Sequence, residues 1–295
     1  MNCGWISWDR AARRSGPPSP GPDRVAPPHG RPGYGATPMR QLWPEPVADA
    51  DPVELYASDH RPAGDRPWVL ANMIASVDGA ATDLTGRSGG LGGPADKRVF
   101  AAIRGVADVV MAGAGTVTAE DYGPSRPSEA VRRARLARGQ AAVPRIAVVS
   151  AALSISPDQR LFREASPDAR PVVLTVEAAD PERRRALAEV AEVHSAGETR
   201  VDWPRALAVL RDRLGARVVL CEGGPTTIAG LVAAGLLDEM CLTVAPTLQT
   251  GAAPRVSDGP APPAARAMAL ARVLTEDGYL FLRYVARDAG TGGGS

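Results

Sequence analysis

The stretch that decides the fold is residues 216–231, ARVVLCEGGPTTIAGL. It begins with a short apolar, β-branched run, which is typical of a buried parallel strand, and Pro225 opens a pattern with helical spacing. In the turn between them, Gly223 and Gly224 let the backbone bend sharply and approach a ligand, while free N–H groups of the first helical turn attract an anion. We therefore predict a phosphate-binding turn with the Glu222 carboxylate beside it; a plain strand-to-helix turn with a solvated Glu222 is the alternative.

A second glycine-bearing turn follows another short apolar run, residues 107–112. This turn contains Gly113, Gly115 and Thr116. Two parallel strands whose carboxyl ends both open into glycine-rich turns predict a ligand that lies across the edge of the sheet. The Gly-x-Gly-x-x-Gly fingerprint is absent, because Thr-Val-Thr follows Gly115, and this disfavours an ordinary Rossmann fold.

Apolar runs and helical patterns alternate along most of the chain. Further strands are predicted at residues 68–77, 145–149, 171–176 and 236–244, and helices from Pro94 and at residues 128–139, 181–190 and 203–214. The last two runs, 269–274 and 279–285, flank Asp277-Gly278 and predict a hairpin. The expected fold class is α/β, with a mixed, mainly parallel sheet flanked by helices and a C-terminal antiparallel hairpin.

Composition excludes several functional classes. The 295-residue chain has a net charge of +1, and its basic residues are scattered among acids, so we expect neither a nucleic-acid partner nor a membrane. The arginines of the helix at residues 128–139, Arg132, Arg133 and Arg135, are expected to face solvent.

Metal-binding patterns are also lacking. Cys3, Cys221 and Cys241 fall outside any Cys-x-x-Cys spacing, and the chain has only 3 histidines. No metal site or disulfide framework is therefore expected, and this fits a cytoplasmic setting.

The two ends differ in composition from the rest. Residues 1–40 hold 8 prolines, 6 glycines and 6 arginines with few clustered apolar residues, which predicts a disordered basic arm without a secretory signal. We place the folded domain at residues 41–288 and a flexible tail at residues 289–295.

Between the strand at residues 68–77 and the helix that starts at Pro94 lies a polar loop, residues 82–93, with 5 glycines. Such a loop can fold over a bound ligand. Asp96 falls near the third position of the helix, where the helix dipole favours a carboxylate, and Arg104 follows a little over two turns later.

An ordered set of short motifs resembles a known family. The motifs are Ser76-Val77-Asp78-Gly79, residues 113–116 (GAGT), Glu120-Asp121, residues 222–226 (EGGPT), Leu237-Asp238-Glu239 and Ala245-Pro246. Over residues 68–285 the sequence resembles the reductase domain of the bacterial riboflavin-pathway deaminase-reductase, and most closely stand-alone actinobacterial members. The resemblance implies a dihydrofolate-reductase-like fold, NADPH as cofactor, a small-molecule substrate and a homodimer. Residues 1–67 lack the His-x-Glu and Pro-Cys-x-x-Cys motifs of the zinc deaminase half.

The resemblance also assigns roles position by position. The implied NADPH contacts are Ile74, Gly113, Gly115, Thr116, Glu120, Ser150, Gly223, Gly224, Pro225, Thr226 and Thr227; Arg160 or Arg163 could hold the 2′-phosphate. The implied substrate contacts are Asn72, Asp78, Ser88, Arg104, Glu222 and Arg126. A surface salt bridge is the alternative role for Arg104.

The match departs from the family at Asn72, where the riboflavin-pathway enzymes commonly have a lysine, and this puts the pathway substrate in doubt. Asp96 corresponds to the carboxylate with which dihydrofolate reductases bind and help to protonate a pterin; helix-end stabilisation is its alternative role. We assign the catalytic acids to Glu222, which orients the substrate, and to Asp96, which acts on its ring.

The predicted function is that of an NADPH-dependent reductase. It would transfer a hydride to the C=N bond of a ribosylaminopyrimidine phosphate or of a dihydropterin. The alternatives are a folate enzyme like dihydrofolate reductase and a non-catalytic NADPH-binding protein.

Overall fold

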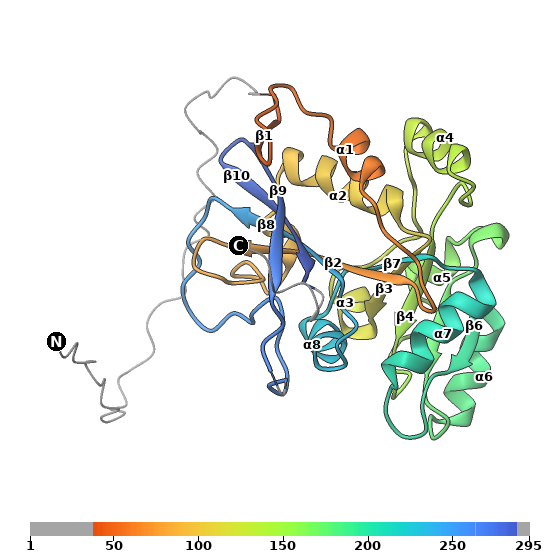
Figure 1. Ribbon diagram of the computed structural model, residues 1–295. Helices are drawn as coiled ribbons and strands as arrows, with labels where there is room; N and C mark the ends of the chain where they lie inside the picture. The colour runs from red at the N-terminus through yellow and green to blue at the C-terminus, as the bar shows by residue number, and fades with distance from the viewer. Residues whose placement is uncertain (1–37, 263, 288–295) are drawn as a thin grey trace, which may run out of the picture. The chain divides into compact units, whose positions relative to one another are not determined.

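The structure is a computed structural model that describes residues 38–262 and 264–287. A ten-stranded sheet runs through the described part of the chain, in the order β1-β9-β10-β8-β2-β7-β3-β4-β5-β6 (Figure 1). Most of the predicted basic arm and the predicted tail lie outside the described residues.

Six neighbouring strand pairs in the sheet are parallel, from β8 to β6. These strands are β8 (Glu239–Ala245), β2 (Trp68–Ser76), β7 (Val218–Cys221), β3 (Val109–Gly113), β4 (Arg145–Val149), β5 (Val172–Thr175) and β6 (Glu192–Ser195). The apolar runs of β7, β3, β4 and β5 are buried on both faces, as expected for parallel strands covered by helices. The carboxyl ends of β2, β7 and β3 therefore meet at one edge of the sheet.

The remaining strands are antiparallel. β9 (Met268–Glu276) and β10 (Tyr279–Ala286) form the predicted hairpin, and β1 (Arg40–Trp43) pairs with β9. The hairpin turn has φ values of 49° at Asp277 and 80° at Gly278, which is the left-handed backbone that Asp-Gly favours between two strands. The predicted fold class, a mixed and mainly parallel α/β sheet with a C-terminal hairpin, is confirmed.

Two apolar clusters lie on opposite faces of the sheet because successive residues of a strand point to opposite faces. On one face pack α1 (Pro52–Ser58), α2 (Pro94–Val106), α3 (Ala114–Ala119), α5 (Arg160–Arg163) and α6 (Pro181–Val190). On the other face pack α7 (Trp203–Leu214) and α8 (Pro225–Ala233). Within β2, Leu70 joins the first cluster, while Val69 and Ala71 join the second.

The helix α4 (Glu129–Ala137) corrects one prediction. Arg132 and Arg133 are exposed, but Arg135 is fully buried. Its guanidinium donates to the carbonyls of Gly105 and Ala107 at the end of α2, at 3.2 and 2.6 Å. A buried helix end needs donors for its last carbonyls, so packing of α4 against α2 overrides the preference of arginine for water.

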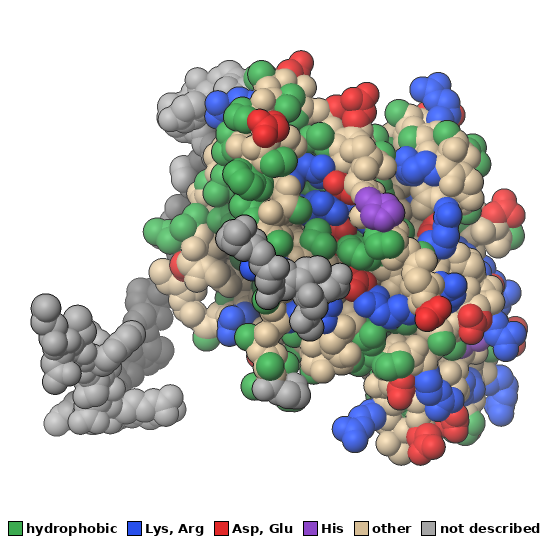
Figure 2. Space-filling model, in the orientation of Figure 1, with side chains coloured by type: hydrophobic (Ala, Val, Ile, Leu, Met, Phe, Trp, Pro, Cys, Tyr) green, Lys and Arg blue, Asp and Glu red, His purple; other side chains and the backbone are tan. Residues whose placement is uncertain are grey.

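Figure 2 shows acidic and basic side chains interspersed on the visible face. Among residues 38–287 other than 263, no cluster of three potential ligands could hold a metal ion, and no helix has the length and hydropathy to span a bilayer. Cys221 and Cys241 are buried free thiols.

Candidate active site

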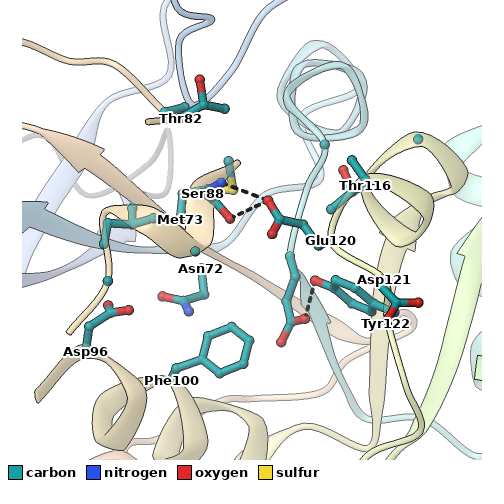
Figure 3. Close-up of a pocket in the computed structure, with 18 of the residues that line it drawn as sticks. Asn72, Met73, Thr82, Ser88, Asp96, Phe100, Thr116, Glu120, Asp121 and Tyr122 are labelled. Atoms are coloured by element: carbon teal, nitrogen blue, oxygen red, sulfur yellow. Dashed lines mark hydrogen bonds between the residues drawn. The ribbon is translucent and has the colours of Figure 1, made fainter. Parts of the chain in front are cut away.

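A cavity of about 690 Å³ opens at the sheet edge where β2 and β7 end. One wall comes from α2 and the glycine-rich loop before it, and the other from α3, the segment after it and the start of α8. Figure 3 shows Asn72, Asp96 and Phe100 on one side of this cavity and Thr116, Glu120 and Tyr122 on the other. The cavity therefore gathers side chains from segments far apart in the sequence.

Glu222 lies at the base of the cavity, directly after β7. Both of its oxygens accept hydrogen bonds from Arg104, at 2.6 Å each, and the Tyr122 hydroxyl donates a third at 2.9 Å. The Glu222 side chain is only 2% exposed. A buried carboxylate with a bidentate guanidinium and a further donor is held in one orientation.

Arg104 is enclosed by aromatic rings as well as by its carboxylate partner. Its guanidinium carbon lies 4.4 Å from the ring centre of Phe100 and 5.6 Å from that of Tyr122. Burial alone would lower the pKa of Arg104, but the facing Glu222 carboxylate reverses this effect and raises it. Burial, assisted by the Glu222 charge, raises the pKa of Tyr122 well above its ordinary value, so Tyr122 remains a hydrogen-bond donor.

Asp96 occupies the third position of α2, as predicted, and lines the same cavity. Burial raises the pKa of its carboxyl, although the hydrogen bond that it accepts from the Thr243 hydroxyl at 2.8 Å opposes this shift. The backbone of the loop packs closely here, because a side chain at Gly92 would meet the Asp96 carboxylate at 2.7 Å. Asp96 is therefore a half-buried acid with a single hydrogen-bonding partner, unlike Glu222.

Glu120 and Ser88 bind each other across the cavity (Figure 3). One Glu120 oxygen accepts hydrogen bonds from the Ser88 backbone N–H and hydroxyl, at 2.8 and 3.0 Å. These bonds tie the glycine-rich loop to the end of α3. The resemblance implies that Glu120 contacts the cofactor and Ser88 the substrate; in this structure their polar groups are directed at one another.

The two glycine turns lie side by side, because β3 and β7 are neighbours in the sheet. The Gly113 N–H donates to the Gly223 carbonyl at 2.8 Å. A Cβ at Gly224 would lie 2.8 Å from the Thr116 hydroxyl, and Gly223 has a φ of 96° that only glycine adopts readily. Larger residues at these positions would close the space between the turns.

A second, smaller cavity of about 290 Å³ adjoins the first, and Gly115 lines both. Its walls include Ser150, Ser154, Trp203, Thr226 and Thr227. The start of α8 separates the two cavities, with Pro225 in the wall of the first. Two pockets joined at a glycine turn and a helix N-terminus fit the two halves of a dinucleotide and the pyrophosphate between them.

The other predicted residues fall in different places. Ile74 and Asn72 line the main cavity, and Arg126 lines its rim, where it binds Glu164 at 2.7 Å. Asp78 is exposed and forms part of neither cavity wall; it accepts hydrogen bonds from Ser76 and from the backbone of Gln249 and Thr250. These bonds, that from Ser76 first, lower its pKa to about 2.

Sequence reasoning missed several residues that line the main cavity, among them Lys97, Phe100 and Tyr122. Phe100 could have been found, because residues four apart on a helix share a face and it lies between Asp96 and Arg104. Tyr122 follows the Glu120-Asp121 motif, but nothing in its local pattern points to Glu222, 100 positions later.

A parallel sheet with an acid-lined cavity at its carboxyl edge, joined to a second pocket by a glycine turn, defines the class of α/β enzymes that act on a small molecule beside a nucleotide. The sequence matches the model of one family, described as the RibD C-terminal domain, over residues 67–278. The chain belongs to this family, and the predicted reductase family is confirmed.

Named relatives agree with this assignment. The 2,5-diamino-6-ribosylamino-4(3H)-pyrimidinone 5′-phosphate reductase of Archaeoglobus fulgidus is 32% identical, over 66% of this chain and 87% of its own. The enzyme of the same name from Methanothermobacter thermautotrophicus is 33% identical, over 63% and 81%. A pyrimidine reductase-like protein from Corynebacterium diphtheriae has a similar structure, with a TM-score of 0.68 and 26% identity over 75% of this chain and 93% of its own.

Proposed function

We propose that the protein is an NADPH-dependent reductase that converts the ribosylamino group of a pyrimidine 5′-phosphate into a ribitylamino group. The observation that carries this proposal is a cavity lined by both the half-buried acid Asp96 and the fixed carboxylate Glu222, with a second cavity of about 290 Å³ beyond Gly115. The names of the relatives supply the substrate class.

The glycine turns and the first turn of α8 would hold the cofactor, which supplies a hydride when bound. Gly113, Gly115, Gly223, Gly224 and Thr116 allow close backbone approach at this point. Ile74 would pack against the reactive ring from the main cavity, and Ser150, Thr226 and Thr227 would contact the adenosine half from the second.

The two acids would have different roles at the substrate: Asp96 would donate a proton and Glu222 would orient the substrate. As hydride adds to the carbon of the C=N bond, the bonding electron pair moves to nitrogen, which then needs a proton. Asp96 is the better donor, because burial favours its protonated form. Glu222 would accept hydrogen bonds from the substrate's amino or hydroxyl groups, since Arg104 and Tyr122 hold its carboxylate in one orientation.

The substrate phosphate requires a cation, and Asn72 cannot supply one. Three of the four cations that line the cavity are already paired with carboxylates, namely Arg104, Arg126 and Arg160. The fourth, Lys97, is exposed and has no carboxylate oxygen within 4.0 Å among the described residues. We assign the binding of the phosphate to Lys97. It would replace the lysine that the riboflavin-pathway enzymes commonly have at the position of Asn72.

The test is a side-by-side turnover assay. The full chain is mixed with NADPH and either 2,5-diamino-6-ribosylamino-4(3H)-pyrimidinone 5′-phosphate or its dephosphorylated form, and cofactor oxidation and product mass are followed. We expect turnover of the phosphorylated compound, with a product heavier by two hydrogens, and a higher KM without the phosphate. Tight NADPH binding without turnover would contradict the proposal and favour a non-catalytic role.

A second candidate substrate is a dihydropterin, and the observation that favours it is the Asp96–Thr243 pair. A carboxyl beside a hydroxyl can bind the amino group and ring nitrogen of a pterin. Dihydrofolate in the same assay separates the two candidates: faster turnover of dihydrofolate would make the folate reaction the main one.

We further propose that the protein acts in the cytoplasm as a homodimer, as the family resemblance implies. Sedimentation of the full chain tests the subunit number.

A further inference from the structure

The second cavity would receive the adenosine half of the cofactor, yet its walls carry no charged side chain among the described residues. The walls offer the hydroxyls of Ser150, Ser154, Thr226 and Thr227 and the indole of Trp203. Hydroxyls can bind a ribose, which is neutral. A 2′-phosphate carries about two negative charges and needs a cation as well.

The two arginines named from the sequence do not supply this cation. Arg160 lines the main cavity instead, where it donates to Asp121 at 2.9 Å. Arg163 lines neither cavity, and among the described residues its guanidinium donates no hydrogen bond to a residue of either cavity wall. The cation must therefore come from another element near the ends of β4 and β5.

Arg183, in the first turn of α6, meets this requirement. Its guanidinium donates to the carbonyl of Ala152, a residue of the cavity wall, at 3.2 Å. The cap of α6 fixes its backbone, because Asp180 accepts from the Arg183 N–H at 2.8 Å. No carboxylate oxygen lies within 4.0 Å of the guanidinium in the described part of the chain. Arg183 is thus an exposed cation at the rim of the cavity, free to pair with an anion.

Ser150 lines the same cavity as Ala152 and is buried. Its oxygen accepts the Ser154 N–H at 3.0 Å, so its own hydrogen remains available for donation. A hydroxyl donor in the wall and a guanidinium bound to the same wall are suited to a phosphate that enters the cavity.

We propose that Arg183 is the residue that distinguishes NADPH from NADH, by pairing with the 2′-phosphate while Ser150 donates to it. This inference rests on the proposed function and names a determinant of its cofactor choice. Because Arg183 is exposed, the pairing is weakened by salt.

The experiment is calorimetric titration of the full chain with NADPH, NADH and adenosine 2′,5′-bisphosphate, for the wild type, Arg183→Ala and Arg185→Ala. Arg185 is a matched control, since it is an exposed arginine of the same helix and lines neither cavity. We expect Arg183→Ala to lose about tenfold or more in affinity for NADPH and for the bisphosphate, and to keep its affinity for NADH. Arg185→Ala should change none of the three affinities.

Each other result overturns the inference. An equal loss of NADPH and NADH affinity in Arg183→Ala would mean that Arg183 stabilises the cavity and does not bind the 2′-phosphate. Unchanged affinities for both dinucleotides would mean that another group binds the 2′-phosphate. If the wild type bound neither dinucleotide, the proposed function itself would fail, which is distinguishable from a wild type that binds both.

Discussion

At the scale of single residues, two carboxylates in one cavity have opposite surroundings. Glu222 has Arg104 on both oxygens and a third donor in Tyr122, so its charge is compensated. Asp96 has one hydroxyl partner, and burial raises its pKa. Two carboxyl groups whose surroundings differ in this way are suited to different roles, one as a proton donor and the other as a hydrogen-bond acceptor.

The first prediction concerns Asp96→Asn. We expect kcat to fall by a factor of about 10² to 10⁴, because the proton donor is lost. In the wild type the protonated form of Asp96 is active and its pKa is raised, so kcat should fall as pH rises through that pKa. The variant should lack this limb of the pH profile.

Asp212→Asn is the matched control for this variant, because Asp212 is an exposed carboxylate of α7 that lines neither cavity. Its kcat and pH profile should equal those of the wild type. An unchanged kcat in Asp96→Asn with every imine substrate would disprove the assigned role of Asp96.

At the scale of elements, α2 presents Asp96, Phe100 and Arg104 along one face, since residues four apart lie one above the other. The loop that precedes α2 is held in place by hydrogen bonds within its own turn and by a contact with the end of α3. Within the loop, Asp83 accepts from the backbone of Thr85 and Arg87. Across the cavity, Glu120 at the end of α3 holds Ser88.

The second prediction tests this connection between the loop and α3. Glu120→Ala removes the oxygen that accepts both hydrogen bonds of Ser88, so the loop should open more often and trypsin should cleave after the exposed Arg87 several-fold faster. Asp121→Asn, at the next position, weakens an exposed contact to Arg160, keeps a residue that tolerates the φ of 47° there, and should leave the cleavage rate unchanged. Equal rates in Glu120→Ala and the wild type would show that Ser88 does not restrain the loop.

At the scale of the whole described part of the chain, a buried ion network joins its beginning to its end. Glu239 in β8 accepts from Arg61 before β2, at 2.9 Å on each oxygen, and from Arg283 in β10, at 2.7 Å. Asp59 extends the network, because it pairs with Arg61 and Arg283 and also accepts a hydrogen bond from Arg272 of β9 at 2.8 Å. Burial alone would raise the pKa of Glu239, but Arg61 and then Arg283 outweigh it and hold the pKa at about 2.

The third prediction follows from this network. Glu239→Gln should lower the free energy of unfolding by about 3–5 kcal/mol, because Arg61 and Arg283 lose a buried partner. Chemical denaturation measures the loss. Glu192→Gln breaks a pair with Arg145 that is partly exposed and should cost no more than about 1 kcal/mol. Similar losses in the two variants would contradict a stabilising role for the network.

The fourth prediction is the pH dependence of that stability. The folded-state pKa of Glu239 is lower than its ordinary value of 4.5, so its contribution is present above that value and is lost as pH falls through about 2. Between these limits the free energy of unfolding should fall more steeply with acid in the wild type than in Glu239→Gln. Parallel curves would show that Glu239 is not the titrating group.

The sequence by itself determined the alternation of strands and helices, the hairpin at Asp277-Gly278, both glycine turns and the position of Asp96 in its helix. These features depend on local periodicity, backbone conformation and helix ends, and each of these is determined by residues that are close together in the sequence. Only the tertiary structure decided the partners of these residues: Arg104 meets Glu222 across 118 positions, Ser88 meets Glu120 across 32, and Arg135 is buried beneath α2. Such contacts arise from the order of strands in the sheet and from the packing of helices on it, and no local pattern specifies either.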